Sequence, residues 1–69
     1  MKIVYSDHAI KRRKQRGIIE LEIEHVLKFP IYVKKTFDDR KEAFGEINGR
    51  EVKIEFVQTE TYIKIITIM

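Results

Sequence analysis

The dipeptide Asn48-Gly49 constrains the fold of this chain more than any other short stretch, because it separates two β-type runs. Asn-Gly is the preferred centre of a two-residue hairpin turn, since both of its residues tolerate positive φ. We therefore predict that residues 42–47 and 50–58 are antiparallel strands joined by this turn. A chain of 69 residues built around such a hairpin has room for one domain, which we assign to residues 1–69.

The two-residue turn also fixes the register of the hairpin. It places Gly45 opposite Val52 on the face toward the core, where a small residue facing a large one allows close packing. Phe44 and Lys53 then pair on the other face of the sheet.

The rest of the chain alternates between strand and helix signals. Ser6 is a good N-cap for a first helix, Gly17 is a typical C-terminal stop, and Pro30 ends a second helix. The predicted order is β-α-α-β-β-β-β: a strand at 2–5, helices to about residue 16 and at 19–28, and strands at 31–37, 42–47, 50–58 and 62–68. We expect an α+β fold in which two N-terminal helices pack on a twisted antiparallel sheet. The last strand is almost continuously apolar, which is typical of a central strand.

Residues 19–28 fit two interpretations. Apolar residues alternate with glutamates as they would in a strand, yet four of the apolar side chains also share one helical stripe. Glutamates near the start and Lys28 at the end suit the dipole of a helix, so we interpret the segment as a helix. This interpretation leaves Leu21 outside the apolar stripe.

Several classes of function are disfavoured by what the sequence lacks. It contains no cysteine, which removes disulfide bonds, cysteine nucleophiles and thiolate metal sites. His8 and His25 lack the spacing of metal ligands, so we expect no metal and no cofactor. No apolar run is long enough to span a membrane, and the first residues do not resemble a signal peptide. We expect a cytoplasmic protein without a membrane partner.

Charge is distributed unevenly along the chain, whose net charge is +3. Residues 1–41 hold eleven Lys or Arg and six Asp or Glu, whereas residues 42–69 hold three and five. Five of the six residues at 11–16 are cationic. Such a cluster is typical of a surface for a polyanion or an acidic partner, and it is equally typical of a solvated helix face.

The first predicted helix divides this basic cluster. His8, Arg12 and Arg16 fall within an arc of about 80°, and the adjoining arc with Ala9 and Arg13 faces the core. The row therefore borders the buried side, where it suits an RNA backbone and where His8 is a candidate general acid or base. The alternative is that the arginines pair with glutamates and the histidine caps or packs.

A second group of candidates lies on the predicted sheet. Arg50, Lys53 and Lys64 suit a nucleic-acid groove in which Tyr62 or Phe44 offers a stacking surface. Arg40, in the loop before the hairpin, is a further phosphate-binding candidate. The alternative is an ordinary charged strand surface.

The motifs resemble two known groups. The first half of the chain contains the run Ser6-x-His8-Ala9-x-x-Arg12-x-x-x-Arg16-Gly17-Ile18, followed by an acidic helix and Pro30. It resembles the S-x-H-A-x-x-R-x-x-x-R-G-I signature of a family of small prokaryotic domains of unknown function. The second half contains Arg40…Gly45…Gly49-Arg50…Val57 and then Lys64-Ile65-Ile66-Thr67, which resembles BrnT-type toxins. Both groups are similar to the RelE/ParE toxin superfamily.

This resemblance implies an RNA-cleaving toxin that a small antitoxin neutralises. In such nucleases, basic and aromatic side chains activate the ribose 2′-hydroxyl and stabilise the phosphate without a metal. Carried over by position, the catalytic candidates are His8, Arg50 and Lys64. The RNA- or phosphate-binding candidates are Arg12, Arg16, Arg40, Lys53 and Tyr62.

Our leading hypothesis is a RelE/BrnT-like toxin-type domain that binds RNA or ribosomes and is a candidate metal-independent ribonuclease. One alternative is a non-enzymatic module that binds nucleic acid or protein. Another is a degenerate toxin without catalysis, since Met69 stands where the BrnT pattern has an arginine. The expected partners are RNA or the ribosome, a small antitoxin, and a second copy of the chain in a homodimer.

Overall fold

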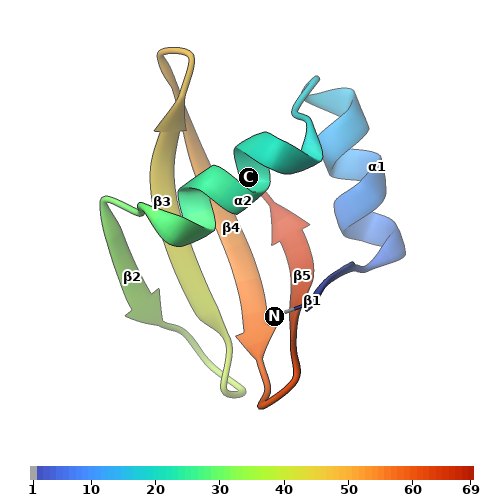
Figure 1. Cartoon of the computed structure of the whole chain (residues 1–69), viewed down its shortest axis with the longest axis vertical. Coiled ribbons are helices and arrows are strands. Elements are labelled where there is room, and N and C mark those ends of the chain that lie inside the picture. Colours follow the sequence, from blue (N-terminus) through green and yellow to red (C-terminus); the bar gives the residue numbers. More distant parts are fainter. Residues whose placement is uncertain (1) are drawn as a thin grey trace.

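The computed structural model describes residues 2–69, which form two helices and one sheet (Figure 1). The elements in chain order are β1 (Lys2–Tyr5), α1 (Asp7–Gln15), α2 (Glu20–Lys28), β2 (Tyr32–Lys35), β3 (Lys41–Ile47), β4 (Arg50–Gln58) and β5 (Tyr62–Ile68). The predicted α+β class and the order β-α-α-β-β-β-β are confirmed. The helical interpretation of the second segment is also confirmed.

The sheet is mixed, so the prediction of an antiparallel sheet was wrong at one edge. The strand order is β1-β5-β4-β3-β2, and β1 runs parallel to β5 while the other neighbours are antiparallel. Ile3 pairs with Ile63, and just beyond β1 the Ser6 amide donates to the Ile65 carbonyl at 3.0 Å. This pairing joins the two ends of the chain, and no local signal in either strand specifies its direction. The apolar strand β5 is interior, because it has a partner on each side, although β4 occupies the middle of the sheet.

The hairpin between β3 and β4 has the predicted register. Gly45 pairs with Val52 and Phe44 with Lys53. The turn residues Asn48 and Gly49 have φ angles of 51° and 80°, as a two-residue turn of this type requires.

The strand predicted at 31–37 is shorter, because a second tight turn follows β2. Asp38 and Asp39 both adopt positive φ, at 57° and 58°, and the Arg40 amide donates to the Phe37 carbonyl at 3.2 Å. Two consecutive left-handed residues define a type I′ turn, which here consists of two aspartates instead of Asn-Gly.

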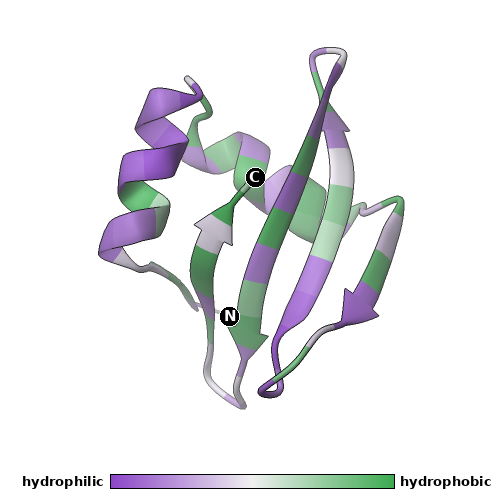
Figure 2. Ribbon diagram, turned by 180° about the vertical axis from the view of Figure 1, so that it is seen from behind, coloured by the Kyte–Doolittle hydropathy of each residue, from purple (hydrophilic) through white to green (hydrophobic). Residues whose placement is uncertain are grey.

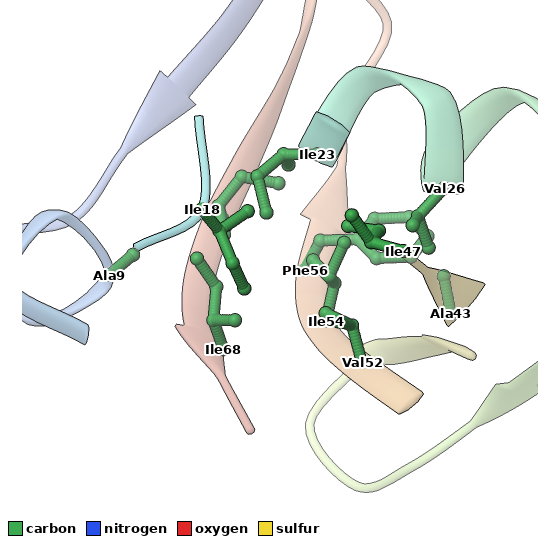
Figure 3. Packing of buried hydrophobic residues seen from close by; sticks show 11 residues of the cluster. Ala9, Ile18, Ile23, Val26, Ala43, Ile47, Val52, Ile54, Phe56 and Ile68 are labelled. Atoms are coloured by element: carbon green, nitrogen blue, oxygen red, sulfur yellow. The ribbon is translucent and has the colours of Figure 1, made fainter. Parts of the chain in front are cut away.

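The hydrophobic core lies between the helices and one face of the sheet (Figure 3). Alternation along β4 directs Val52, Ile54 and Phe56 toward the helices, and all three are buried. The opposite face of β3, β4 and β5 carries no helix, as the view from behind shows (Figure 2). We call this uncovered side the open face.

Local chemistry fixes where the helices start and how closely they pack. The Ser6 hydroxyl accepts from the Ala9 amide at 3.0 Å and donates to the Ile66 carbonyl at 2.7 Å, so it caps α1 and ties it to β5. A Cβ on Gly45 would lie 2.8 Å from Cγ1 of Val26. The glycine therefore lets α2 lie directly against β3.

Candidate functional site

Three arginines, at α1 and at the start of β4, donate side-chain hydrogen bonds to main-chain carbonyls. Arg12 donates through Nε to the Ile68 carbonyl at 3.3 Å, at the end of β5. Arg16 donates through Nη2 to the carbonyl of Glu51 at 3.3 Å, and Arg50 donates through Nη1 to the Arg16 carbonyl at 2.9 Å. We call Arg12, Arg16 and Arg50 the arginine corner.

The positions of these arginines follow from secondary structure. Arg12 and Arg16 are four residues apart, so they lie one helical turn apart on the same face. Arg50 shares its side of β4 with Val52, which is buried against the helices. The side chains of α1 and of the first residue of β4 therefore converge on the helix side of the sheet.

The arginine corner keeps most of its hydrogen-bonding capacity. A guanidinium has five N–H donors, and the bonds to the three carbonyls above use one donor from each residue. Within residues 2–69, no carboxylate forms an ion pair with any of the three. The glutamate pairing considered as an alternative is thus absent from these three arginines within residues 2–69. Such a set of planar donors suits a phosphate or another oxyanion.

His8 lies one turn before Arg12 on α1 and is exposed. In the described part of the chain it makes no hydrogen bond or ion pair. The predicted row of His8, Arg12 and Arg16 therefore exists as a line on α1, with the histidine at its solvent end.

Arg13, by contrast, is engaged in internal contacts. It donates to the Ile18 carbonyl at 3.0 Å and lies 3.9 Å from the Glu20 carboxylate, so it connects the two helices. Its guanidinium also lies over the ring of Tyr5, 5.7 Å from the centroid. With Ala9 fully buried, the predicted inward arc of α1 is confirmed.

Lys53, Tyr62 and Lys64 lie on the open face. Lys64 stands between Ile63 and Ile65, whose side chains pack into the core, so alternation directs it the other way. The three catalytic candidates are therefore not brought together, because Lys64 lies on the opposite side of the sheet from Arg50 and from α1.

Arg40 also belongs to the open face, but it has a carboxylate partner. Its Nη1 donates to the Glu55 carboxylate at 2.9 Å, and its guanidinium lies 5.7 Å from the ring centroid of Phe37. Glu55 faces Glu42 across the β3–β4 ladder, and Lys34 lies 3.4 Å from the Glu42 carboxylate. The two opposed carboxylates are thus each offset by a cation, which leaves less of the Arg40 charge for an external phosphate.

Phe44, a predicted stacking candidate, has an aromatic neighbour on the open face that the sequence did not predict. The rings of Tyr32 and Phe44 are stacked with centroids 5.0 Å apart and an interplanar angle of 12°. Phe44 lies opposite Lys53 in the ladder. The two rings lie side by side because Tyr32 pairs with Phe44 between β2 and β3. No turn motif in the sequence specifies the register of these two strands.

Tyr5 is the core tyrosine of β1. Its pKa is raised to about 12, chiefly by burial and then by the charge of Glu20, with a smaller rise from Glu24, while Arg13 opposes the shift. Its hydroxyl is buried and has no hydrogen-bond partner among residues 2–69. We assign it to the core and not to the site.

Residues 2–69 contain no group of three His, Cys, Asp or Glu side chains placed to hold a metal ion. In the same part of the chain, neither helix has the length and apolar character needed to cross a bilayer.

The fold and the arginine corner define a small α+β domain with a group of basic side chains at α1 and the start of β4. A family model described as "Domain of unknown function (DUF4258)" matches residues 5–69, so the chain belongs to this family. No curated protein and no solved structure matches it significantly.

Proposed function

We propose that this domain binds the phosphate backbone of RNA through the arginine corner. The observation that carries the proposal is that three guanidinium groups at α1 and the start of β4 donate to main-chain carbonyls and, within residues 2–69, have no carboxylate partner. Arginine matches the geometry of a phosphate with two parallel donors, and such contacts give affinity without reading sequence.

Other cations near the arginine corner add to its positive electrostatic potential. Lys11 and Lys14 are exposed on α1, which belongs to the half of the chain that carries the excess of positive charge. Charges of this kind act over about a Debye length and speed the approach of a polyanion. The arginines would then provide the fixed contacts, and the lysines the attraction at longer range.

The same proposal places the protein near the RelE/BrnT-like toxins. Its support is the β-α-α-β-β-β-β order together with the signature residues His8, Arg12 and Arg16, which form a row on α1. On this basis the domain acts in the cytoplasm on RNA or ribosomes, and a small antitoxin is its protein partner.

Binding without cleavage is the form of this function that the geometry favours. Metal-independent cleavage by His8, Arg50 and Lys64 would need the three around one phosphate, and Lys64 lies across the sheet from the other two. We therefore expect labelled RNA to stay intact when incubated with the protein in EDTA. Cleavage that is lost in Arg50→Ala would instead establish a ribonuclease.

Fluorescence anisotropy of an end-labelled single-stranded RNA tests the proposal. Because bound cations release counterions from the backbone, affinity should fall by at least tenfold between about 50 and 200 mM KCl. An affinity that does not change with salt, or no binding at the lower salt, would overturn the phosphate-binding function.

A further inference from the structure

Two lysines face each other across the β2–β3 ladder, next to the Asp38-Asp39 turn. Lys35 pairs directly with Lys41, which places their Cβ atoms about 5 Å apart on the same side of the sheet. Like charges in opposed positions of a sheet repel each other and destabilise it. Within residues 2–69, neither lysine forms an ion pair with a carboxylate. We call Lys35 and Lys41 the lysine pair.

The lysine pair borders a cavity at the turn. The cavity has a volume of about 310 Å³ and is lined by the pair together with Thr36, Asp39 and Arg40. This volume lies at the lower end of the range for small-molecule sites. The turn precedes β3 and the start of β4 follows it, so the cavity and the arginine corner lie at opposite ends of β3 (Figure 1). We call the cavity the turn pocket.

The other charged groups of the turn pocket leave the lysine pair as its free positive charge. The Arg40 guanidinium is bonded to the Glu55 carboxylate and adds little. Asp39 is the one acidic residue in the lining, and in the described part of the chain it forms no ion pair with either lysine. Two ammonium groups therefore outweigh one carboxylate.

We infer that the turn pocket binds a phosphate group with two negative charges, held between Lys35 and Lys41. A dianion between two ammonium groups replaces their mutual repulsion with two attractions. Each ammonium also offers three hydrogen-bond donors, and lysine commonly binds phosphate as a point charge.

The charge of the ligand separates a terminal phosphate from one inside an RNA backbone. A phosphate monoester carries close to two negative charges at pH 7, whereas a backbone phosphate carries one. The opposed lysines therefore favour a terminal phosphate, whose source is free phosphate, a small phosphate ester or the 5′ end of an RNA. The pocket uses none of the residues of the arginine corner, so this inference does not rest on the proposed function.

Nitrogen–proton correlation NMR of the labelled protein, titrated with inorganic phosphate at constant ionic strength, tests the inference. We expect saturable shifts of the backbone amides at residues 35–41. Lys35→Gln and Lys41→Gln should each weaken the affinity by about fivefold, the upper end for an exposed ion pair. Asp39→Asn should strengthen it, because the carboxylate is removed while asparagine tolerates the left-handed φ of 58°.

A matched control removes the same charge elsewhere. Lys2→Gln changes an exposed lysine of β1, at the other edge of the sheet, and should leave the affinity within about twofold of wild type. Without phosphate, the two variants of the lysine pair should melt no lower than the wild type, because each removes the repulsion between the lysines. Weaker binding by these variants then has no origin in unfolding.

Two short RNAs that differ only in a 5′-phosphate or a 5′-hydroxyl identify the source of the phosphate. Displacement of inorganic phosphate by the phosphorylated RNA alone would assign the pocket to an RNA end. No displacement by either RNA would assign it to free phosphate or a small ester. Equal displacement by both RNAs would contradict the preference for two charges. An absence of saturable shifts at residues 35–41, or equal weakening by Lys35→Gln and Lys2→Gln, would overturn the inference.

Discussion

Arg50 donates a hydrogen bond of 2.9 Å to the main-chain carbonyl of Arg16, and Arg16 in turn donates to the carbonyl of the residue that follows Arg50. Arg50 therefore holds the backbone of Arg16, Arg16 holds that of Glu51, and the end of α1 is tied to the beginning of β4. Long arginine side chains lose conformational entropy when they bind a ligand. Bonds that already fix both guanidinium groups reduce this cost, which is why we regard the corner as preorganised for an anion.

Gly45→Ala tests the close contact of α2 with β3. A Cβ would lie 2.8 Å from a methyl group of Val26, whose branched side chain has few alternative rotamers. We expect the free energy of unfolding in urea to fall by about 1–3 kcal/mol. Glu46→Ala, at the next and exposed position of β3, is the control and should change it by less than about 0.5 kcal/mol. Equal stability of both variants would mean that the helix and the strand are not in contact there.

Ser6→Ala tests the junction of α1 with β5. The substitution removes the cap of the Ala9 amide and the bond to the Ile66 carbonyl together. We expect a loss of about 1–2 kcal/mol, which in a domain of this size lowers Tm by roughly 4–8 °C per kcal/mol. Thr61→Ala, in an exposed turn, is the matched loss of a hydroxyl. If the two variants melt together, Ser6 does not hold this junction.

The Asp38-Asp39 turn offers a substitution that should stabilise the protein. Both aspartates have left-handed φ angles, and the chain's other hairpin solves the same problem with Asn48-Gly49. Exchanging the aspartates for Asn and Gly removes backbone strain and two adjacent negative charges. We expect the free energy of unfolding to rise by about 0.5–1.5 kcal/mol. A lower stability would show that the carboxylates contribute contacts that outweigh the strain.

Tyr5 predicts how stability depends on alkaline pH. Its pKa is raised to about 12 in the folded chain, chiefly by burial, against 10 for an ordinary tyrosine. Above pH 10 the unfolded chain releases the phenol proton more readily than the folded chain, so stability is lost between about pH 10 and 12. Absorbance at about 295 nm should show a titration step with a midpoint near 12 that Tyr5→Phe removes. A wild-type titration without a late step would contradict the burial of this phenol.

Much of the fold could be predicted because its signals are local. The Asn48-Gly49 turn specifies the register of β3 and β4, and the serine and glycine that flank α1 mark its ends. The parallel pairing of β1 with β5 could not be predicted, since the two strands lie at opposite ends of the chain and each reads simply as apolar.

The candidate site could be predicted only in part, because some of its contacts are tertiary. The row on α1 follows from helical periodicity, but the carbonyl that each arginine reaches depends on tertiary contacts. Arg50 was grouped with Lys64 because both lie on strands. Arg50 is two residues from the buried Val52, so it lies on the side of β4 that faces the helices, whereas Lys64 faces away from them.

The salt dependence of RNA binding tests the central claim most directly when two double variants are compared. Arg12→Gln with Arg16→Gln, and Lys11→Gln with Lys14→Gln, each remove two positive charges from α1. We expect the arginine variant to lose at least tenfold in affinity and its slope of log K against log [salt] to flatten by about 1.4, the value for two lost contacts to a single strand. The lysine variant should lose about threefold or less, with a nearly unchanged slope. Equal losses in the two variants, with circular dichroism confirming that both are folded, would show that net charge and not the arginine corner holds the RNA.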